Sequence, residues 1–181
     1  MVYIHLSDGF EEIEALTAFD LLKRAEIGVE TVSVTGRLPV KGAHGVQVIC
    51  DILFEDADYN TCEMIVLPGG MPGAKNLANH AGLMEKLYSF ANQGGFIAAI
   101  CASPGRVLGA HGILNGRRAT CYPGFEKYLE DATFVDEKVV IDENLITSKG
   151  PATAIDFALA IIENLKGAEV RNQIAKDILY T

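Results

Sequence analysis

The chain has 181 residues, of which 49% are hydrophobic and 22% charged, and its formal net charge is −9. This length suits one domain with an ordinary core, and the apolar fraction is too high for a disordered chain. The negative charge, without any basic run, argues against nucleic acid and anionic membranes as partners. We therefore expect one domain that spans residues 1–181.

The cysteines and the acidic residues near the start of the chain indicate in which cellular compartment the protein is expected. Four cysteines are too few and too dispersed for a disulfide framework. Five acidic residues lie among the first twenty, so we expect no signal peptide or membrane span to begin there. A reduced, cytoplasmic protein is the default expectation.

Apolar runs alternate with amphipathic stretches from the start of the chain. Val2–Leu6 predicts a buried strand, residues 11–25 a helix, and residues 29–34 a second strand. The helical spacing predicts four side chains that face the core, namely Ile13, Leu16, Phe19 and Leu22. Two strands joined by a helix of this length form a βαβ unit, so at least part of the sheet is parallel.

The same alternation continues downstream. Ser103 and Pro104 suit the N-cap and first position of a helix that follows a central strand. The predicted elements are, in chain order, a strand at Met64–Leu67, a helix at 83–92, a strand at Phe96–Ile100, a hairpin of 139–141 with 145–147, and a helix at 153–165. The sequence therefore predicts a three-layer α/β domain.

Cys101 is the strongest candidate for a reactive residue. Ligands of open α/β sheets bind beyond the carboxyl ends of parallel strands, and Cys101 directly follows one. Small residues two positions to either side, Ala99 and Ser103, meet the steric requirement of a nucleophile elbow. A thiol just before a helix meets unpaired N–H groups, which stabilise the thiolate. We interpret the other three cysteines as inert buried thiols, namely Cys50, Cys62 and Cys121.

The partner of this thiol is expected to be a carboxyl group. His111 lies about 15 Å from Cys101 by helical rise, and no later histidine exists to complete a hydrolase triad. We interpret the other three histidines as exposed or as satisfied core residues, and Glu11 and Glu12 as solvated acids at a helix start. Glu14 lies one turn further, where a carboxyl near a thiolate would have a raised pKa and could transfer a proton.

The run Leu67-Pro68-Gly69-Gly70 predicts an oxyanion site at the end of its strand. We expect the N–H groups of Gly70 and Ala102 to face charge that develops beside Cys101, although a tight strand-exit turn would explain the glycines equally well. No nucleotide-loop pattern and no metal-ligand spacing occur, so we expect neither a metal nor another cofactor.

Together these motifs resemble the ThiJ/PfpI superfamily over nearly the whole chain, in particular the branch of the parkinsonism-associated protein deglycase and its bacterial relatives. The motifs are residues 11–14, 67–70, 98–104 and 147–151, with the helix at 156–161. The resemblance implies a flavodoxin-like sandwich, a homodimer, and Cys101 as a nucleophilic, redox-sensitive thiol. It also implies Glu14 as the protonated partner, and Gly70 and Ala102 as backbone donors.

Two departures from the superfamily narrow the expected activity. Ala102 stands where the protease-like branch has histidine, which argues against a peptidase. Tyr122 precedes Pro123 where some relatives place a pocket histidine, so we expect Tyr122 in the pocket. A phenol can donate a hydrogen bond but is a poor base near neutral pH.

The function expected from these residues is cysteine-dependent, cofactor-independent aldehyde processing, glyoxalase-like or deglycase-like. The Cys101 thiolate would attack a methylglyoxal-type 2-oxoaldehyde or one of its adducts, and Glu14 would move the proton. The alternative is a non-enzymatic oxidative-stress sensor or chaperone that uses oxidation of Cys101. An ordinary thiol hydrolase ranks last because no histidine base is recognisable.

Overall fold

A seven-stranded sheet forms the centre of the protein in the computed structural model, which describes residues 1–180. Every neighbouring pair of strands is parallel except β10 and β11, which form the predicted C-terminal hairpin. The strands lie in the order β10 (Val139–Asp142), β11 (Leu145–Ser148), β7 (Phe96–Ile100), β6 (Met64–Leu67), β1 (Val2–Leu6), β2 (Val29–Ser33) and β5 (Ile52–Leu53).

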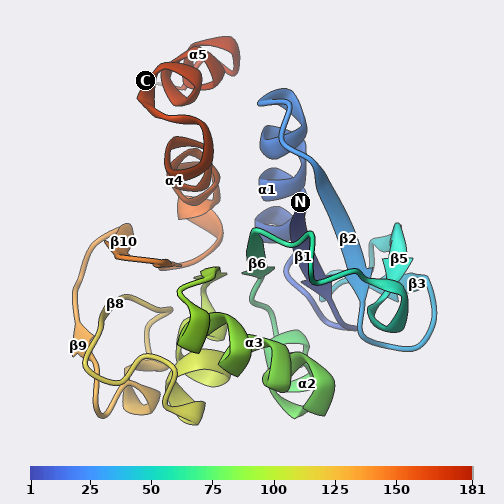
Figure 1. Ribbon diagram of the computed structural model, residues 1–181, viewed down its shortest axis with the longest axis vertical. Helices are drawn as coiled ribbons and strands as arrows, with labels where there is room; N and C mark the ends of the chain where they lie inside the picture. Colours follow the sequence, from blue (N-terminus) through green and yellow to red (C-terminus); the bar gives the residue numbers. More distant parts are fainter. Residues whose placement is uncertain (181) are drawn as a thin grey trace.

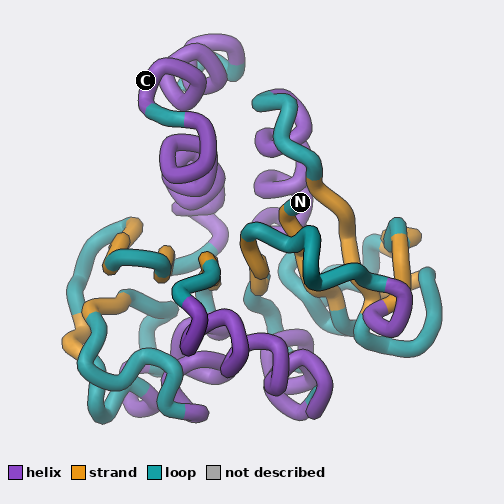
Figure 2. The backbone as a smooth tube through the Cα atoms, in the orientation of Figure 1, coloured by secondary structure: helices purple, strands orange, loops and turns teal. Residues whose placement is uncertain are grey.

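Helices cover both faces of this sheet, as the predicted sandwich requires (Figure 1). One layer contains α1 (Glu12–Arg24), α4 (Ala154–Lys166) and α5 (Ala168–Asp177), and α4 packs against both of the others. The opposite layer contains α2 (Gly73–Asn79) and α3 (Ala81–Gln93). Figure 2 shows the strands between these two groups of helices. The mostly parallel, three-layer α/β fold is therefore confirmed.

The prediction omitted α2, α5 and several short elements, since two- or three-residue strands carry too little periodicity to be recognised. The short elements are β5, a hairpin of β3 (Pro39–Lys41) and β4 (Gln47–Ile49), a pair of β8 (Arg118–Ala119) and β9 (Thr133–Phe134), and 3-10 turns at Phe54–Asp56, Gly109–His111, Glu126–Tyr128 and Pro151–Thr153. The helix predicted from Ser103 and Pro104 is a wide helical turn at Pro104–Leu108. No helix within residues 1–180 is long and apolar enough to cross a membrane.

Helix α1 presents a different face to the core from the one predicted. Ile13 and Leu16 are 54% and 37% exposed, whereas Ala15 and Ala18 are buried together with Leu22. Small alanine side chains let the helix lie close to the strands and to α4, so the larger side chains are turned outward. The prediction was therefore wrong for Ile13 and Leu16. Their exposure leaves an apolar surface on α1, and the expected homodimer stays a prediction.

His5 on β1 is completely buried in an aromatic cluster. Its Nε2 lies 2.6 Å from the Tyr59 hydroxyl oxygen, and the two rings stack with centroids 6.0 Å apart. Phe54 lies between the Tyr59 and His80 rings and completes the cluster. Burial lowers the pKa of His5 to about 3, with a smaller contribution from His80. His5 is thus neutral at physiological pH and acts as a core residue.

We predict that His5 makes the folded protein acid-sensitive. The unfolded chain binds a proton at this histidine near pH 6.5, whereas the folded chain binds it only near pH 3. Stability should therefore fall as the pH drops through this window, by roughly 4–5 kcal/mol in total. The double variant His5→Leu/Tyr59→Phe should lose this dependence in urea unfolding measured from pH 7 to pH 4.

The half-buried His111 supplies the matched control. The variant His111→Gln should retain the pH dependence of the wild type, because His111 lies outside the aromatic cluster. Equal acid sensitivity in the double variant and the wild type would contradict the assignment to His5.

Candidate active site

Cys101 lies in a sharp turn directly after β7. Its φ of +66° places it in the left-handed region, which costs a non-glycine residue about 1–3 kcal/mol. Two backbone hydrogen bonds hold the turn: the Cys101 N–H donates to the Ser148 carbonyl at 2.9 Å, and the Tyr122 N–H donates to the Cys101 carbonyl at 2.8 Å. The strand-to-helix elbow predicted at Cys101 is confirmed as a backbone conformation.

Ser103 has a role different from the predicted helix cap. Its backbone is already helical, with φ −68° and ψ −38°, and its side chain accepts no capping bond. Instead the buried Ser103 hydroxyl donates to the Pro68 carbonyl at 2.6 Å. This bond ties the segment after Cys101 to the loop after β6. Ser103 and Pro104 do occupy the predicted cap and first positions of the turn at Pro104–Leu108, but the Ser103 side chain makes no capping bond.

Glu14 is a buried carboxyl directed at the carboxyl ends of the strands. It is 1% exposed, and its Oε2 accepts the Gly69 N–H at 2.7 Å. Its Oε1 is buried without a hydrogen-bond partner among the described residues. Burial raises the pKa of Glu14 to about 7, against the Gly69 N–H and the neighbouring Cys101 thiol, which lower it. Glu14 can therefore gain or lose a proton near neutral pH.

Gly69 lies between Glu14 and Cys101 and permits their approach. A Cβ atom on Gly69 would lie 2.6 Å from Cys101 Cβ, 2.9 Å from Cys101 Sγ and 2.8 Å from Glu14 Oε2. All three distances are too short for any side chain, so the thiol and the carboxyl meet across a bare backbone. The structure thus brings together Cys101 and Glu14, the two residues predicted to be catalytic.

The acidity of Cys101 differs from the expected stabilised thiolate. Burial and the neighbouring Glu14 carboxylate raise the pKa of the Cys101 thiol above its ordinary value. The N–H groups of Gly70 and Ala102 act in the opposite direction but do not prevail. The Cys101 thiol and the Glu14 carboxyl therefore titrate as a pair, and the protonation of one changes the pKa of the other. The expected backbone donors therefore act on the thiol in the predicted direction, and burial outweighs them.

The two predicted backbone donors and Tyr122 also lie at this site. Gly70 has a φ of +88°, and a Cβ there would lie 2.5 Å from both the Gly9 carbonyl and the Glu11 nitrogen. Only glycine fits this position, which places its N–H beside Cys101. Tyr122 is 45% exposed, its ring lies against Gly150, and its backbone N–H binds the Cys101 carbonyl. The roles of these residues stay predictions.

Burial is the main cause of the raised thiol pKa at the three other cysteines. Burial raises the pKa of Cys50 to about 11 and those of Cys62 and Cys121 to about 12. Cys62 lines a cavity of about 530 Å³ beside Tyr59, Phe90 and Leu165, near the amino ends of β6 and β7. That cavity lies at the opposite edge of the sheet from Cys101.

Glu11 and Glu12 are not the solvated acids predicted from the sequence. They are 9% and 8% exposed, and Glu12 accepts the backbone N–H groups of His44 and Val46. His44 Nδ1 lies 2.9 Å from Glu12 Oε2, and one ligand atom from each of Glu11, Glu12 and His44 lies within 4.8 Å of the others. This spacing could hold a metal ion, but His44 already binds Glu12 and lies 3.7 Å from Glu11, which joins the start of α1 to the β3–β4 hairpin.

Comparison with known proteins assigns the chain to a family. Residues 1–164 match the DJ-1/PfpI family. The structure superposes on oxidized Toxoplasma gondii DJ-1 with a TM-score of 0.96 at 38% identity, covering 99% of this chain and 98% of that one. The fold and the elbow thus define a DJ-1/PfpI-type α/β domain. The chain belongs to the DJ-1/PfpI family, as its motifs predicted.

Curated relatives differ in length from this chain. Protein DJ-1 homolog B of Arabidopsis thaliana is 38% identical over 178 residues, 98% of this chain. The chain spans only 41% of that protein and 45% of the plant homolog A. Glutathione-independent glyoxalase DJR-1.2 of Caenorhabditis elegans is 40% identical over 170 residues, 93% of this chain and 89% of the relative.

We predict that Gly69→Ala disrupts the site more than the fold. The added methyl group must displace the Cys101 or Glu14 side chain, which should cost about 1–3 kcal/mol in urea unfolding. The rate at which iodoacetamide alkylates Cys101 should change in the same variant. In the control Gly28→Ala the methyl group meets only the Met1 side chain, 3.3 Å away, and both measurements should stay near wild type. Unchanged alkylation in Gly69→Ala would contradict the described contact.

Proposed function

We propose that the chain is a cysteine-dependent enzyme that converts small 2-oxoaldehydes to 2-hydroxy acids without metal or glutathione. The observation that carries this proposal is the pair of Cys101 and Glu14, which meet across Gly69 with one carboxyl oxygen free of hydrogen bonds. A pKa of about 7 lets Glu14 serve as acid and as base in one cycle. The name of the C. elegans relative supports the same class of reaction.

The first step forms a carbon–sulfur bond. The reactive form of the pair has its proton on Glu14 and a thiolate at Cys101, which attacks the aldehyde carbon. The carbonyl electron pair moves to oxygen, where the N–H groups of Gly70 and Ala102 stabilise the negative charge. This oxygen then takes the proton of Glu14 and gives a hemithioacetal.

The second step moves hydrogen between neighbouring carbons. The Glu14 carboxylate removes the proton from the former aldehyde carbon, and the electron pair forms an enediolate with its charge on the ketone oxygen. Glu14 returns the proton to the former ketone carbon, and the hydroxyl proton of the former aldehyde carbon passes to the negatively charged oxygen. A 2-hydroxy thioester then remains on Cys101. Water cleaves the thioester and restores the thiol, so the net change is addition of one water to the 2-oxoaldehyde.

We predict that the protein forms lactate from methylglyoxal and that this activity requires both residues. Cys101→Ser should reduce lactate formation to the level of buffer, because the covalent intermediate cannot form. Glu14→Gln should lower kcat by about 10²–10⁴, the usual contribution of a positioned acid–base group. Cys62→Ser, at the opposite edge of the sheet, should retain wild-type turnover. Lactate production by Cys101→Ser would contradict the mechanism.

A second candidate function is oxidative-stress sensing, which the oxidized form of the Toxoplasma relative favours. Here two peroxide molecules oxidise the Cys101 thiol to a sulfinic acid and are reduced to two water molecules. Glu14 would serve by holding or donating a proton rather than by turning over substrate. The same pair of residues supports both candidates, so activity measurements must decide between them.

We predict that graded hydrogen peroxide adds oxygen first at Cys101. Intact-mass and peptide mass spectrometry should show a gain of two oxygens at Cys101 before any change at the three other cysteines. Selective oxidation without aldehyde turnover would favour the sensor over the enzyme. Oxidation of all four cysteines at similar rates would exclude a specific sensor role for Cys101.

A further inference from the structure

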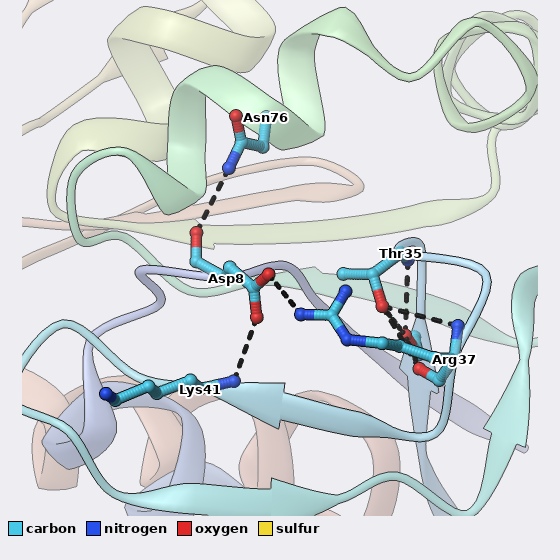
Figure 3. Close-up of polar contacts among 6 residues, drawn as sticks. Asp8, Thr35, Arg37, Lys41 and Asn76 are labelled. Carbon is cyan, nitrogen blue, oxygen red and sulfur yellow. Dashed lines mark hydrogen bonds and ion pairs between the residues drawn. The ribbon is translucent and has the colours of Figure 1, made fainter.

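Asp8 connects the turn after β1 to two other segments (Figure 3). Its Oδ1 accepts the Lys41 N–H at 3.0 Å, and its Oδ2 accepts a hydrogen bond from Arg37 Nη2 at 2.5 Å. The carbonyl of Asp8 accepts the Asn76 side-chain amide from α2 at 3.1 Å. The next residue, Gly9, donates its N–H to the Lys41 carbonyl at 2.8 Å. Asp8 is thus attached to β3 on one side and to α2 on the other.

The backbone contacts matter more here than the ion pair. The side chains of Asp8 and Arg37 are 41% and 53% exposed, and such pairs contribute little to stability. The Lys41 N–H, followed by Arg37, holds the pKa of the Asp8 carboxyl below its usual range. An ionised carboxylate that accepts a backbone N–H makes a directional bond, which fixes the turn relative to β3.

The same turn supports the backbone loop beside Cys101. The Gly9 carbonyl accepts the Gly73 N–H at 3.2 Å, and the Glu11 N–H donates to the Gly69 carbonyl at 3.0 Å. A Cβ on Gly70 would lie only 2.5 Å from the Gly9 carbonyl oxygen, so the two segments are in tight contact. Any displacement of the turn at residues 7–9 must therefore displace Gly70 as well.

We propose that Asp8 is a positioning residue that, through the turn at residues 7–9, sets the Gly70 N–H against the Cys101 thiol. Asp8 touches neither the thiol nor a substrate, and it acts only through Gly9 and the loop after β6. The inference rests on the proposed use of Cys101 as a nucleophile. Its test is the reactivity of the thiol itself, which does not depend on aldehyde turnover.

The direction in which the Cys101 pKa changes when Asp8 is replaced distinguishes a positioning role of Asp8 from a direct effect of its charge. The Gly70 N–H lowers the pKa of Cys101, so a displaced Gly70 should raise that pKa and slow alkylation at neutral pH. Loss of the Asp8 charge alone would do the opposite, because removing a nearby anion favours the thiolate. The two explanations therefore predict shifts of opposite sign.

The experiment measures the pH profile of Cys101 alkylation by iodoacetamide, followed on the Cys101 peptide by mass spectrometry. Asp8→Ala should slow the reaction at pH 7 by roughly five- to tenfold and shift the profile to higher pH. Asp8→Asn keeps an oxygen that can accept the Lys41 N–H, so its rate should stay within about twofold of wild type. In the lactate assay, Asp8→Ala should lower kcat and leave KM nearly unchanged.

Two further variants serve as a control for charge and as a second test of the turn. Asp20→Ala removes an exposed carboxylate of α1 that pairs with Arg24, and its alkylation profile should match wild type. Asn76→Ala removes only the donor to the Asp8 carbonyl and should shift the profile in the same direction as Asp8→Ala. If Asp8→Ala does not fold, the alkylation profile of Asn76→Ala tests the proposal in its place. A profile that is unchanged or shifted to lower pH in folded Asp8→Ala, or in Asn76→Ala if Asp8→Ala does not fold, would overturn the proposal.

Discussion

The close approach of Glu14 and Cys101 across Gly69 is the constraint around which this edge of the sheet is built. A buried carboxyl without full hydrogen bonding is costly in its charged form, and Glu14 receives only the Gly69 N–H. Its proton is therefore retained close to neutral pH. The loop after β6 must supply both that donor and the space for two side chains, which only a glycine at position 69 permits.

This arrangement stores strain that the core has to offset. Cys101 occupies the left-handed region, and Glu14 Oε1 is left without a partner, each at a cost of order 1–3 kcal/mol. Strands β1, β6 and β7 are paired in parallel register, so their carboxyl ends deliver the three segments of the site to one edge. Because these strands are completely buried along most of their length, the strained turn is held by the best-packed part of the molecule.

Most of the sheet was predictable because its strands are near-continuous apolar runs, and Cys101 was recognisable from the small residues around it. The orientation of α1 was not, since Ala15 and Ala18 face the core in place of the larger Ile13 and Leu16. Sequence spacing cannot show which face of a helix fits closest to a sheet. The pairing of the buried Glu12 with the exposed His44 also escaped prediction, because it joins residues 32 positions apart through a hairpin too short to recognise.

The sequence indicated backbone donors for the Cys101 thiolate but not the burial that raises the thiol pKa, and both bear on the chemistry of the site. A carboxyl with a pKa of about 7 covers the acid–base range of an unperturbed histidine, so the site needs no imidazole beside the thiol. The charges differ, however: a histidine partner would be cationic beside the thiolate, whereas Glu14 is neutral or anionic. The reactive pair therefore keeps a net negative charge, to which the nearby Glu11 adds. A negatively charged site disfavours anionic substrates relative to neutral ones, and the 2-oxoaldehydes that we propose as substrates are neutral.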